Sequence, residues 1–198
     1  MPTTVTRRTS YRRRAPPRRK SAPKKSWFGT SRARPEMKRK HTNLDDQTVT
    51  GSAAYQQLFA VDGIGQGLTD SSRIGDRITG KYINSKFLFD NQSDTKAMLV
   101  RYCIWSPKST TQTLALTGTN FINNKLFRVW KQGYLSINHD SAKVLSVNIP
   151  LKNKVFDFSG DDTTLPVSQD RIYLTMTCVT SGMTVKFTHN TTVYYVDN

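Results

Sequence analysis

From Thr42 onward the chain contains no glutamate, and 20 of its residues are threonine. Glutamate is a good helix former, whereas threonine, valine, tyrosine and phenylalanine favour β-strands. No stretch of this region has the periodicity of a long amphipathic helix. The composition therefore predicts an all-β body.

Alternating apolar and polar residues, which mark half-buried strands, recur along the same region. We expect eight strands separated by turn residues. These cover residues 48–61, 77–90, 96–106, 126–131, 143–149, 155–158, 171–180 and 184–196. The stretch 96–106 is apolar on both faces, as in a central strand. In 77–90 the apolar side chains change face, which predicts a bulge or bend near Asn84. The sequence "TSGMT" predicts a tight hairpin between the last two strands.

The net charge of +16 is concentrated at the N-terminus. Met1–His41 carries 15 of the 30 lysines and arginines but a single acidic residue, Glu36, whereas the rest of the chain balances 15 basic residues against 13 aspartates. The basic segment is rich in proline and serine and poor in apolar side chains, so we expect it to be disordered in the free protein. The chain is thus predicted to consist of a disordered basic arm, residues 1–41, and a β domain, residues 42–198.

A disordered arm of arginines and lysines binds phosphates through charge and counterion release, without reading sequence. Arginine adds bidentate phosphate contacts. The predicted nucleic-acid contacts are Arg7, Arg8, Arg12, Arg13, Arg14, Arg18, Arg19, Lys20, Lys24, Lys25, Arg32, Arg34, Lys38, Arg39 and Lys40. Trp27 and Phe28 would either stack on bases or anchor the arm to the domain. Short basic runs in the arm also have the composition of nuclear import signals.

No catalytic constellation is present in the sequence. His41, His139 and His189 are far apart, and none lies near a cysteine or a carboxylate pair at metal-ligand spacing. We therefore predict that the protein is not an enzyme and binds no cofactor or metal. Asp161 and Asp162 lie in a polar loop, where solvated charges are expected; a calcium site between neighbouring subunits is the alternative.

Both cysteines, Cys103 and Cys178, fall in predicted strands, and their spacing gives no support for a disulfide. We expect two buried, reduced thiols. The sequence shows no signal peptide, and no apolar run approaches the roughly 18 residues of a membrane span. We therefore expect a protein that is kept in a reducing compartment and is not inserted into a membrane.

Two segments resemble capsid proteins of circular Rep-encoding single-stranded DNA viruses. "GIGQGLTDSSRIGDRITGKYI" (63–83) is similar to their Gly/Gln-rich loop followed by an Arg-x-Gly-Asp-x-Ile strand entry. "GTNFINNKLFRVWKQGYLSIN" (118–138) is similar to a strand that follows a short helical turn, both in these proteins and in satellite tobacco necrosis virus. Phe127–Lys131 carries this second match. The order of a basic arm followed by an eight-stranded body is also similar, and this order covers nearly the whole chain.

The resemblance implies a single eight-stranded antiparallel jelly roll with BIDG and CHEF sheets. It assigns 77–90 to strand C, 96–106 to strand D and 184–196 to strand I, and places strand B within 48–61. It also implies a structural coat protein that forms a T=1 shell of about 60 copies in closed symmetry, with the arms inside on the genome. The virion, and the host nucleus during assembly, are the expected locations, with import receptors as further partners.

Single-stranded DNA is favoured over RNA, because Arg73–Ile78 resembles the DNA-virus group, although Phe127–Lys131 is shared with an RNA satellite virus. Lys81 and Lys86 are candidates for additional nucleic-acid contacts from the inner shell surface, or are simply solvated.

Two other functions remain open. A cellular nucleic-acid-binding β protein would need a basic and aromatic face, and a nuclease would need paired carboxylates or a metal set.

Overall fold

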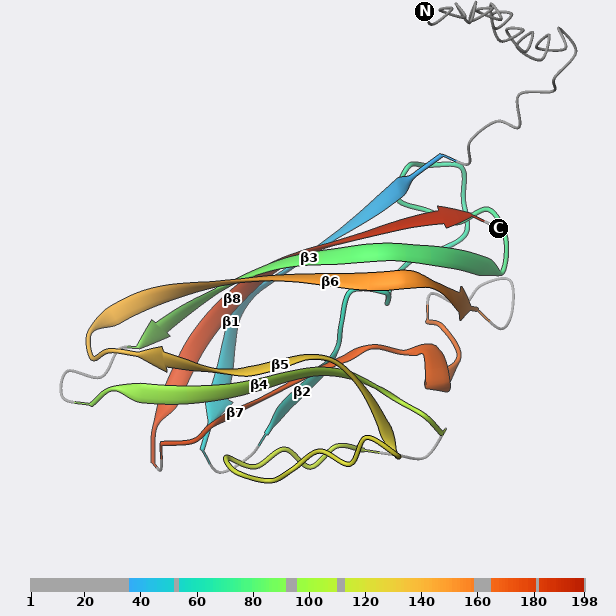
Figure 1. The fold of residues 1–198 in the computed structure, drawn as a ribbon. Coiled ribbons are helices and arrows are strands. Elements are labelled where there is room, and N and C mark those ends of the chain that lie inside the picture. Colours follow the sequence, from blue (N-terminus) through green and yellow to red (C-terminus); the bar gives the residue numbers. More distant parts are fainter. Residues whose placement is uncertain are drawn as a thin grey trace, which may run out of the picture. The chain divides into compact units, whose positions relative to one another are not determined.

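The computed structural model describes residues 36–51, 54–91, 96–109, 113–158, 165–180 and 182–197. In this part of the chain, eight strands form two four-stranded sheets that face each other (Figure 1). The elements are β1 (Lys38–Thr50), β2 (Tyr55–Leu58), β3 (Arg77–Asn91), β4 (Met98–Pro107), β5 (Phe127–Ile137), β6 (Ser141–Asp157), the 3-10 turn η1 (Ser168–Asp170), β7 (Tyr173–Cys178) and β8 (Thr184–Asp197).

The first sheet has the order β1-β8-β3-β6 and the second β2-β7-β4-β5, with every neighbouring pair antiparallel. When the strands are lettered B to I along the chain, these orders are BIDG and CHEF. The predicted fold class, an all-β jelly roll of two four-stranded sheets, is confirmed.

The first expected strand, 48–61, is in fact two strands separated by a bend at Gly51. The earlier of these, β1, reaches back to Lys38, so four residues that we predicted in the arm belong to the sheet. Consequently β3 is strand D and β4 is strand E, not C and D as the resemblance implied. The assignment of β8 to strand I is correct.

The two expected strands 143–149 and 155–158 are one continuous strand, β6. The chain passes through Lys152 and Asn153 with positive φ angles of 52° and 60°, so the strand bends without ending. We read the polar interruption as a turn, because a left-handed pair of non-glycine residues inside a strand is uncommon.

The predicted hairpin between the last two strands is wrong. A short turn with Gly182 at φ 72° does connect β7 to β8. However, β7 pairs with β2 and β4 in the second sheet, whereas β8 pairs with β1 and β3 in the first. Both strands bury one face in the same core, and alternation alone does not identify a strand's hydrogen-bonding partner.

A bulge in β3 changes the face of its side chains, as expected, but at Lys81, three residues earlier than Asn84. The register against both neighbouring strands shifts between Gly80 and Tyr82. Before the shift Ile78 is buried, and after it Ile83 is buried, so the core side changes from even to odd positions. As a result Tyr82 lies on the face away from the core.

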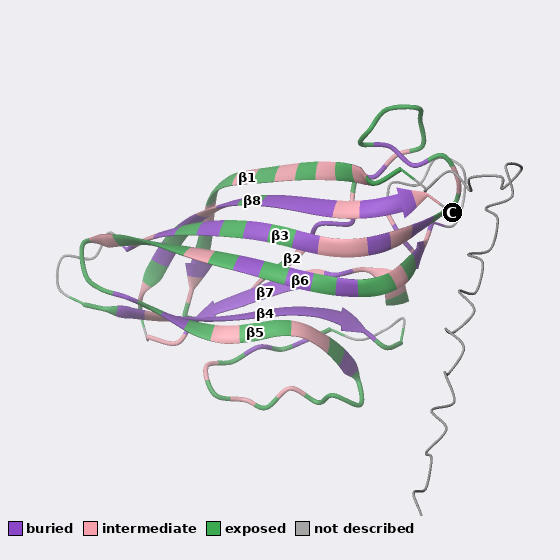
Figure 2. Cartoon of the chain, turned by 45° about the horizontal axis from the view of Figure 1, so that its top comes forward, coloured by how far each residue is buried: buried purple, intermediate pink, exposed green. Residues whose placement is uncertain are grey.

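The main core lies between the two sheets, and its centre is aromatic. Phe87 lies 6.1 Å from Phe59 and 6.1 Å from Phe89, and Phe187 lies 5.7 Å from Phe89, measured between ring centroids. Figure 2 shows buried and exposed residues alternating along β3 and β6, as expected for strands that bury one face.

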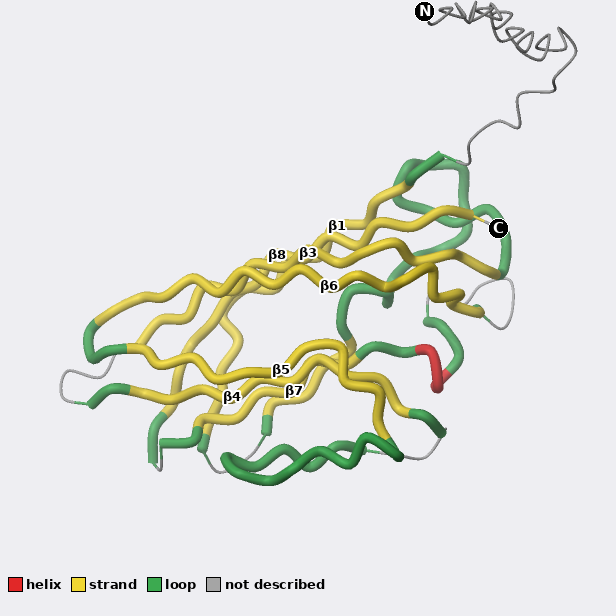
Figure 3. The backbone as a smooth tube through the Cα atoms, in the orientation of Figure 1, coloured by secondary structure: helices red, strands yellow, loops and turns green. Residues whose placement is uncertain are grey.

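The central strand β4 is buried on both faces, as predicted. Its second face carries Cys103 and Trp105, which pack against Leu114 and Leu116 in the long segment between β4 and β5 (Figure 3).

Cys103 and Cys178 are both free and buried, which confirms the prediction of buried thiols. Burial raises the pKa of the Cys103 thiol to about 12, although nearby Arg101 opposes the shift.

Arg101 fastens this long segment to β4. Its guanidinium donates to the carbonyl oxygen of Thr117 (2.5 Å), to Asn120 Oδ1 (2.7 Å) and to the carbonyl oxygen of Asn120 (2.7 Å). It also lies 5.6 Å from the ring centroid of Tyr134. A buried cation with three acceptors thus holds a segment whose described residues form no strand or helix.

Replacing Arg101 with methionine should lower the free energy of unfolding by about 3–5 kcal/mol, because three acceptors lose their charged partner while the cost of burying the guanidinium is removed. Urea denaturation followed by tryptophan fluorescence measures this. The matched control is Tyr134→Phe, which removes one exposed bond to the carbonyl oxygen of Gly118. A loss for Arg101→Met no larger than for the control would contradict the fastening role.

Candidate nucleic-acid interface

Twelve of the fifteen predicted phosphate contacts, together with Trp27 and Phe28, fall within residues 1–35 and lie outside the described residues. Their roles stay predictions. Asp161 and Asp162 also lie outside the described part of the chain. The structure places the other three predicted contacts, Lys38, Arg39 and Lys40, at the start of β1.

Because β1 is a strand, these three cations point to opposite faces. Lys38 Nζ lies 2.8 Å from Asp197 Oδ2 and donates to the carbonyl oxygen of Ser72 at 2.9 Å. Lys40 Nζ donates to the carbonyl oxygen of Gly63 at 3.0 Å. These contacts tie both ammonium groups to the domain, and the predicted phosphate contacts of Lys38 and Lys40 stay predictions. Arg39 is exposed on the other face and keeps its predicted role.

The loop before β3 is held by a buried arginine. Arg73 is fully buried, its Nη1 donates to the carbonyl oxygen of Gly75 and to Asp76 Oδ1 (3.3 Å), and its guanidinium lies 4.6 Å from the Phe158 ring centroid. Arg73, Gly75 and Asp76, which belong to the Arg-x-Gly-Asp resemblance, therefore hold the loop against the domain. Arg73 itself is too buried to contact a ligand.

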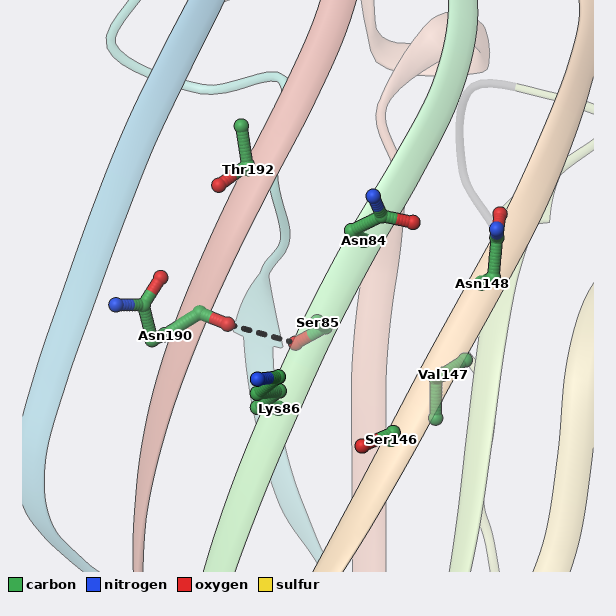
Figure 4. A pocket seen from close by; sticks show the side chains of 8 residues that line it. All are labelled: Asn84, Ser85, Lys86, Ser146, Val147, Asn148, Asn190 and Thr192. Atoms are coloured by element: carbon green, nitrogen blue, oxygen red, sulfur yellow. Dashed lines mark hydrogen bonds between the residues drawn. The ribbon is translucent and has the colours of Figure 1, made fainter.

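The face of the first sheet that points away from the core, here called the open face, carries polar side chains in cross-strand rows. One row consists of His41, Thr192, Asn84 and Asn148, and the next of Asn43, Asn190, Lys86 and Ser146. Six of these residues, with Ser85 and Val147, line a hollow of about 440 Å³ (Figure 4).

The hollow offers amide and hydroxyl groups and one positive charge. No carboxylate lines it, and Lys86 supplies the charge from β3. Amide side chains both donate and accept hydrogen bonds, so such a surface suits bases, sugars or water. Lys81, which was predicted together with Lys86 as an additional contact, lies at the β3 bulge and donates to Asn153 Oδ1 at 2.9 Å. No local pattern predicts these rows, because cross-strand register decides which amides become neighbours.

The histidines do not form a site. His41 lies on the open face with Nδ1 2.8 Å from Thr192 Oγ1, whereas His189 faces the core from β8. His139 lies in an exposed turn. Among the described residues, no three His, Cys, Asp or Glu side chains gather closely enough to hold a metal ion. In the same residues no helix has the length and apolarity needed to cross a membrane.

His189 is buried among aromatic rings, 5.4 Å from Phe87 and 6.0 Å from Phe59 between ring centroids. Its Nδ1 lies 3.1 Å from Thr191 Oγ1. Burial lowers the pKa of the imidazole to about 4, against the opposing influence of the Asp45 carboxylate. The ring is therefore neutral in the folded protein near neutral pH.

This pKa predicts a loss of stability in mild acid. Above pH 6.5 the ring is neutral in both states; as the pH falls towards about 4, the unfolded chain takes up a proton that the folded chain excludes. The cost by pH 4 is about 3 kcal/mol, at 1.36 kcal/mol for each tenfold difference in proton affinity.

The variant His189→Phe should lack this component, because phenylalanine suits the aromatic surroundings and does not titrate. Urea denaturation of the variant and of the unmodified protein between about pH 4 and pH 6.5 measures how the free energy of unfolding of each depends on pH. Equal pH dependence in the variant and in the unmodified protein would contradict the assignment.

Comparisons with known proteins give likenesses among solved structures. No family model matches this chain, and no curated protein matches it. Among solved structures, it is similar to a chain in "Structure of infectious bursal disease virus Gx strain", with 12% identity and a TM-score of 0.36. The match covers 81% of this chain and 32% of that one, so this chain spans about a third of its length.

Proposed function

We propose that this chain is a viral coat protein that self-assembles into a small icosahedral shell and packages single-stranded nucleic acid. The observation that carries the proposal is the direct continuation of a strongly basic segment into the edge strand β1 of a BIDG sheet. A jelly roll supplies a rigid building block, and the basic segment supplies charge that reads no sequence.

Exposed apolar side chains on the loops support self-assembly. The side chain of Phe121 is 100% exposed, and that of Leu68 is 92% exposed. Phe121 lies between β4 and β5, and Leu68 lies between β2 and β3. Covering each such side chain with a neighbouring copy would contribute about 1.5–3 kcal/mol. Single exposed apolar residues are common, but fully exposed ones on two separate loops suit contacts that recur around a shell.

The distribution of charge supports packaging. Residues 42–198 carry 15 basic and 13 acidic side chains, so neighbouring domains repel one another only weakly. An arm of about +14, multiplied over the roughly 60 copies of a T=1 shell, supplies on the order of 840 positive charges, which matches a genome on the order of a thousand phosphates. DNA is the favoured genome, on the resemblance of the loop at 63–83. The basic runs would also serve nuclear import before assembly in the host nucleus.

A cellular protein that binds nucleic acid with its β domain is the second candidate, and the polar hollow on the open face favours it. The two functions differ in what becomes of the nucleic acid. A coat protein encloses its nucleic acid and shields it from nucleases, whereas a binding domain leaves it accessible.

Replacing the ten lysines and arginines between Arg7 and Lys25 with glutamine should leave the domain folded but greatly reduce packaged nucleic acid. The salt dependence of binding should also flatten, because each lost phosphate contact removes about 0.7–0.9 from the slope of log K against log salt. Nuclease-resistant nucleic acid per protein, and binding across a salt series, measure the two effects.

The matched control replaces ten uncharged residues of the arm with glutamine, which keeps its length and charge. Packaging by the ten-cation variant equal to that of the control would sink the assignment of these cations. Treating the released nucleic acid with DNase and with RNase identifies its sugar, and DNase-sensitive material is expected.

A further inference from the structure

We propose that an aromatic row on the domain binds the bases of single-stranded nucleic acid. The aromatic row consists of Arg39, Tyr194, Tyr82 and Pro150, which lie in register across β1, β8, β3 and β6. The inference rests on the proposed packaging function and adds a claim to it. Besides the charge of the arm, the folded domain itself contacts the strand through bases.

The centre of the row is a stacked pair of tyrosines. Tyr82 and Tyr194 are directly paired residues of neighbouring strands, with ring centroids 4.2 Å apart and an interplanar angle of 22°. Both are half-buried and lie on the open face, since the neighbouring Ile83 and Tyr195 face the core. The β3 bulge is what turns Tyr82 outward. Tyrosine is amphipathic, so a ring pair on an open face is a platform for another flat ring.

Positive charge lies on one side of this platform. Arg39 is in register with Tyr194 on the edge strand and is exposed. It follows the basic arm directly in the chain. A strand bound by the arm would therefore reach the row through a residue that itself contacts phosphate.

More positive charge lies beyond the other end of the row. Pro150 borders a pocket of about 590 Å³ between β5 and β6, which is also lined by Arg128, Trp130, Lys152 and Lys154. No carboxylate lines this pocket. Arg128 lies 5.4 Å from the Trp130 ring centroid.

These cations differ in how they are held. Lys154 is paired with Asp170 at 2.6 Å. Arg128 and Lys152, in contrast, form no ion pair within the described part of the chain. Two cations thus stay available for phosphate at this end of the row.

A single nucleic-acid strand fits this arrangement better than other polyanions. Proteins that bind single strands without sequence preference combine a basic path for the backbone with aromatic rings for the bases. The four strands place Arg39 and Pro150, the ends of the row, about 15 Å apart, at roughly 4.8 Å per strand, with the tyrosines between them. A duplex keeps its bases stacked inside. A sulfated glycan would use the cations but would gain nothing from a stacked tyrosine pair.

The test compares binding of the full chain to oligothymidylate and to an abasic strand of the same length, about 16 nucleotides. Both carry the same phosphates, so the lysines and arginines of the arm bind them equally, and the tyrosine variants below separate the row from stacking by Trp27 and Phe28. Measured at raised salt, where the contribution of the arm is weakened, the unmodified protein should prefer the base-bearing strand about tenfold, as expected for stacking. The double variant Tyr82→Ser/Tyr194→Ser should lose this preference.

Two further variants separate stacking from structural effects. Tyr82→Phe/Tyr194→Phe keeps both rings and should retain the preference. Tyr134→Ser removes an exposed aromatic ring of β5, in the second sheet, and should also retain it. If the serine variant fails to fold, photo-crosslinking of bromouracil-substituted strands to the unmodified protein decides. Crosslinks at Tyr82 or Tyr194 support the proposal.

Several results would overturn the inference. These are an unmodified protein that binds both strands equally, a serine variant that keeps the preference, or crosslinks confined to residues 1–35. Equal competition by heparin and by oligothymidylate at raised salt would likewise point to charge alone. Each of these leaves packaging by the arm intact. If the unmodified protein instead shows no salt-dependent binding to either strand, the proposed function itself fails.

Discussion

The packing of the two sheets through the aromatic centre of the core is the interaction on which the rest of the structure depends. Phe87, Phe89 and Phe187 are fully or almost fully buried, and each such side chain contributes about 1.5–3 kcal/mol on burial. Because β3 and β8 commit one face to this core, their other face is left to polar and aromatic residues. The open face, its hollow and the tyrosine pair are therefore consequences of the same register that forms the core.

The fold class could be predicted from the sequence because alternation and composition reflect which side of a strand is buried. The number of strands was right only because two errors offset each other. β1 went unnoticed as a separate strand because its inward positions carry Lys38 and Lys40, which are held by an ion pair and a hydrogen bond. An edge strand anchored by polar contacts has no apolar alternation to detect. The bend of β6 at Lys152 had the opposite effect, since it resembled a turn.

The candidate interface was only partly predictable. Charge content identified the basic arm, because phosphate binding by a disordered chain depends on composition alone. The aromatic row depends on register between strands that are far apart in sequence, and Tyr82 joins it only because a bulge shifts β3 by one residue. The pocket between β5 and β6 brings Arg128 near Lys152 across two sheets. No local sequence pattern predicts that these two edge strands, β5 and β6, lie next to each other.

Self-assembly is the central claim of this account, and analytical ultracentrifugation with electron microscopy of the purified full chain tests it most directly. With single-stranded DNA added, we expect a fast, homogeneous species and closed particles of uniform diameter. Particles of this kind would place the basic arm and the jelly roll in one function. A chain that stays monomeric across salt and pH, with and without nucleic acid, would contradict the account.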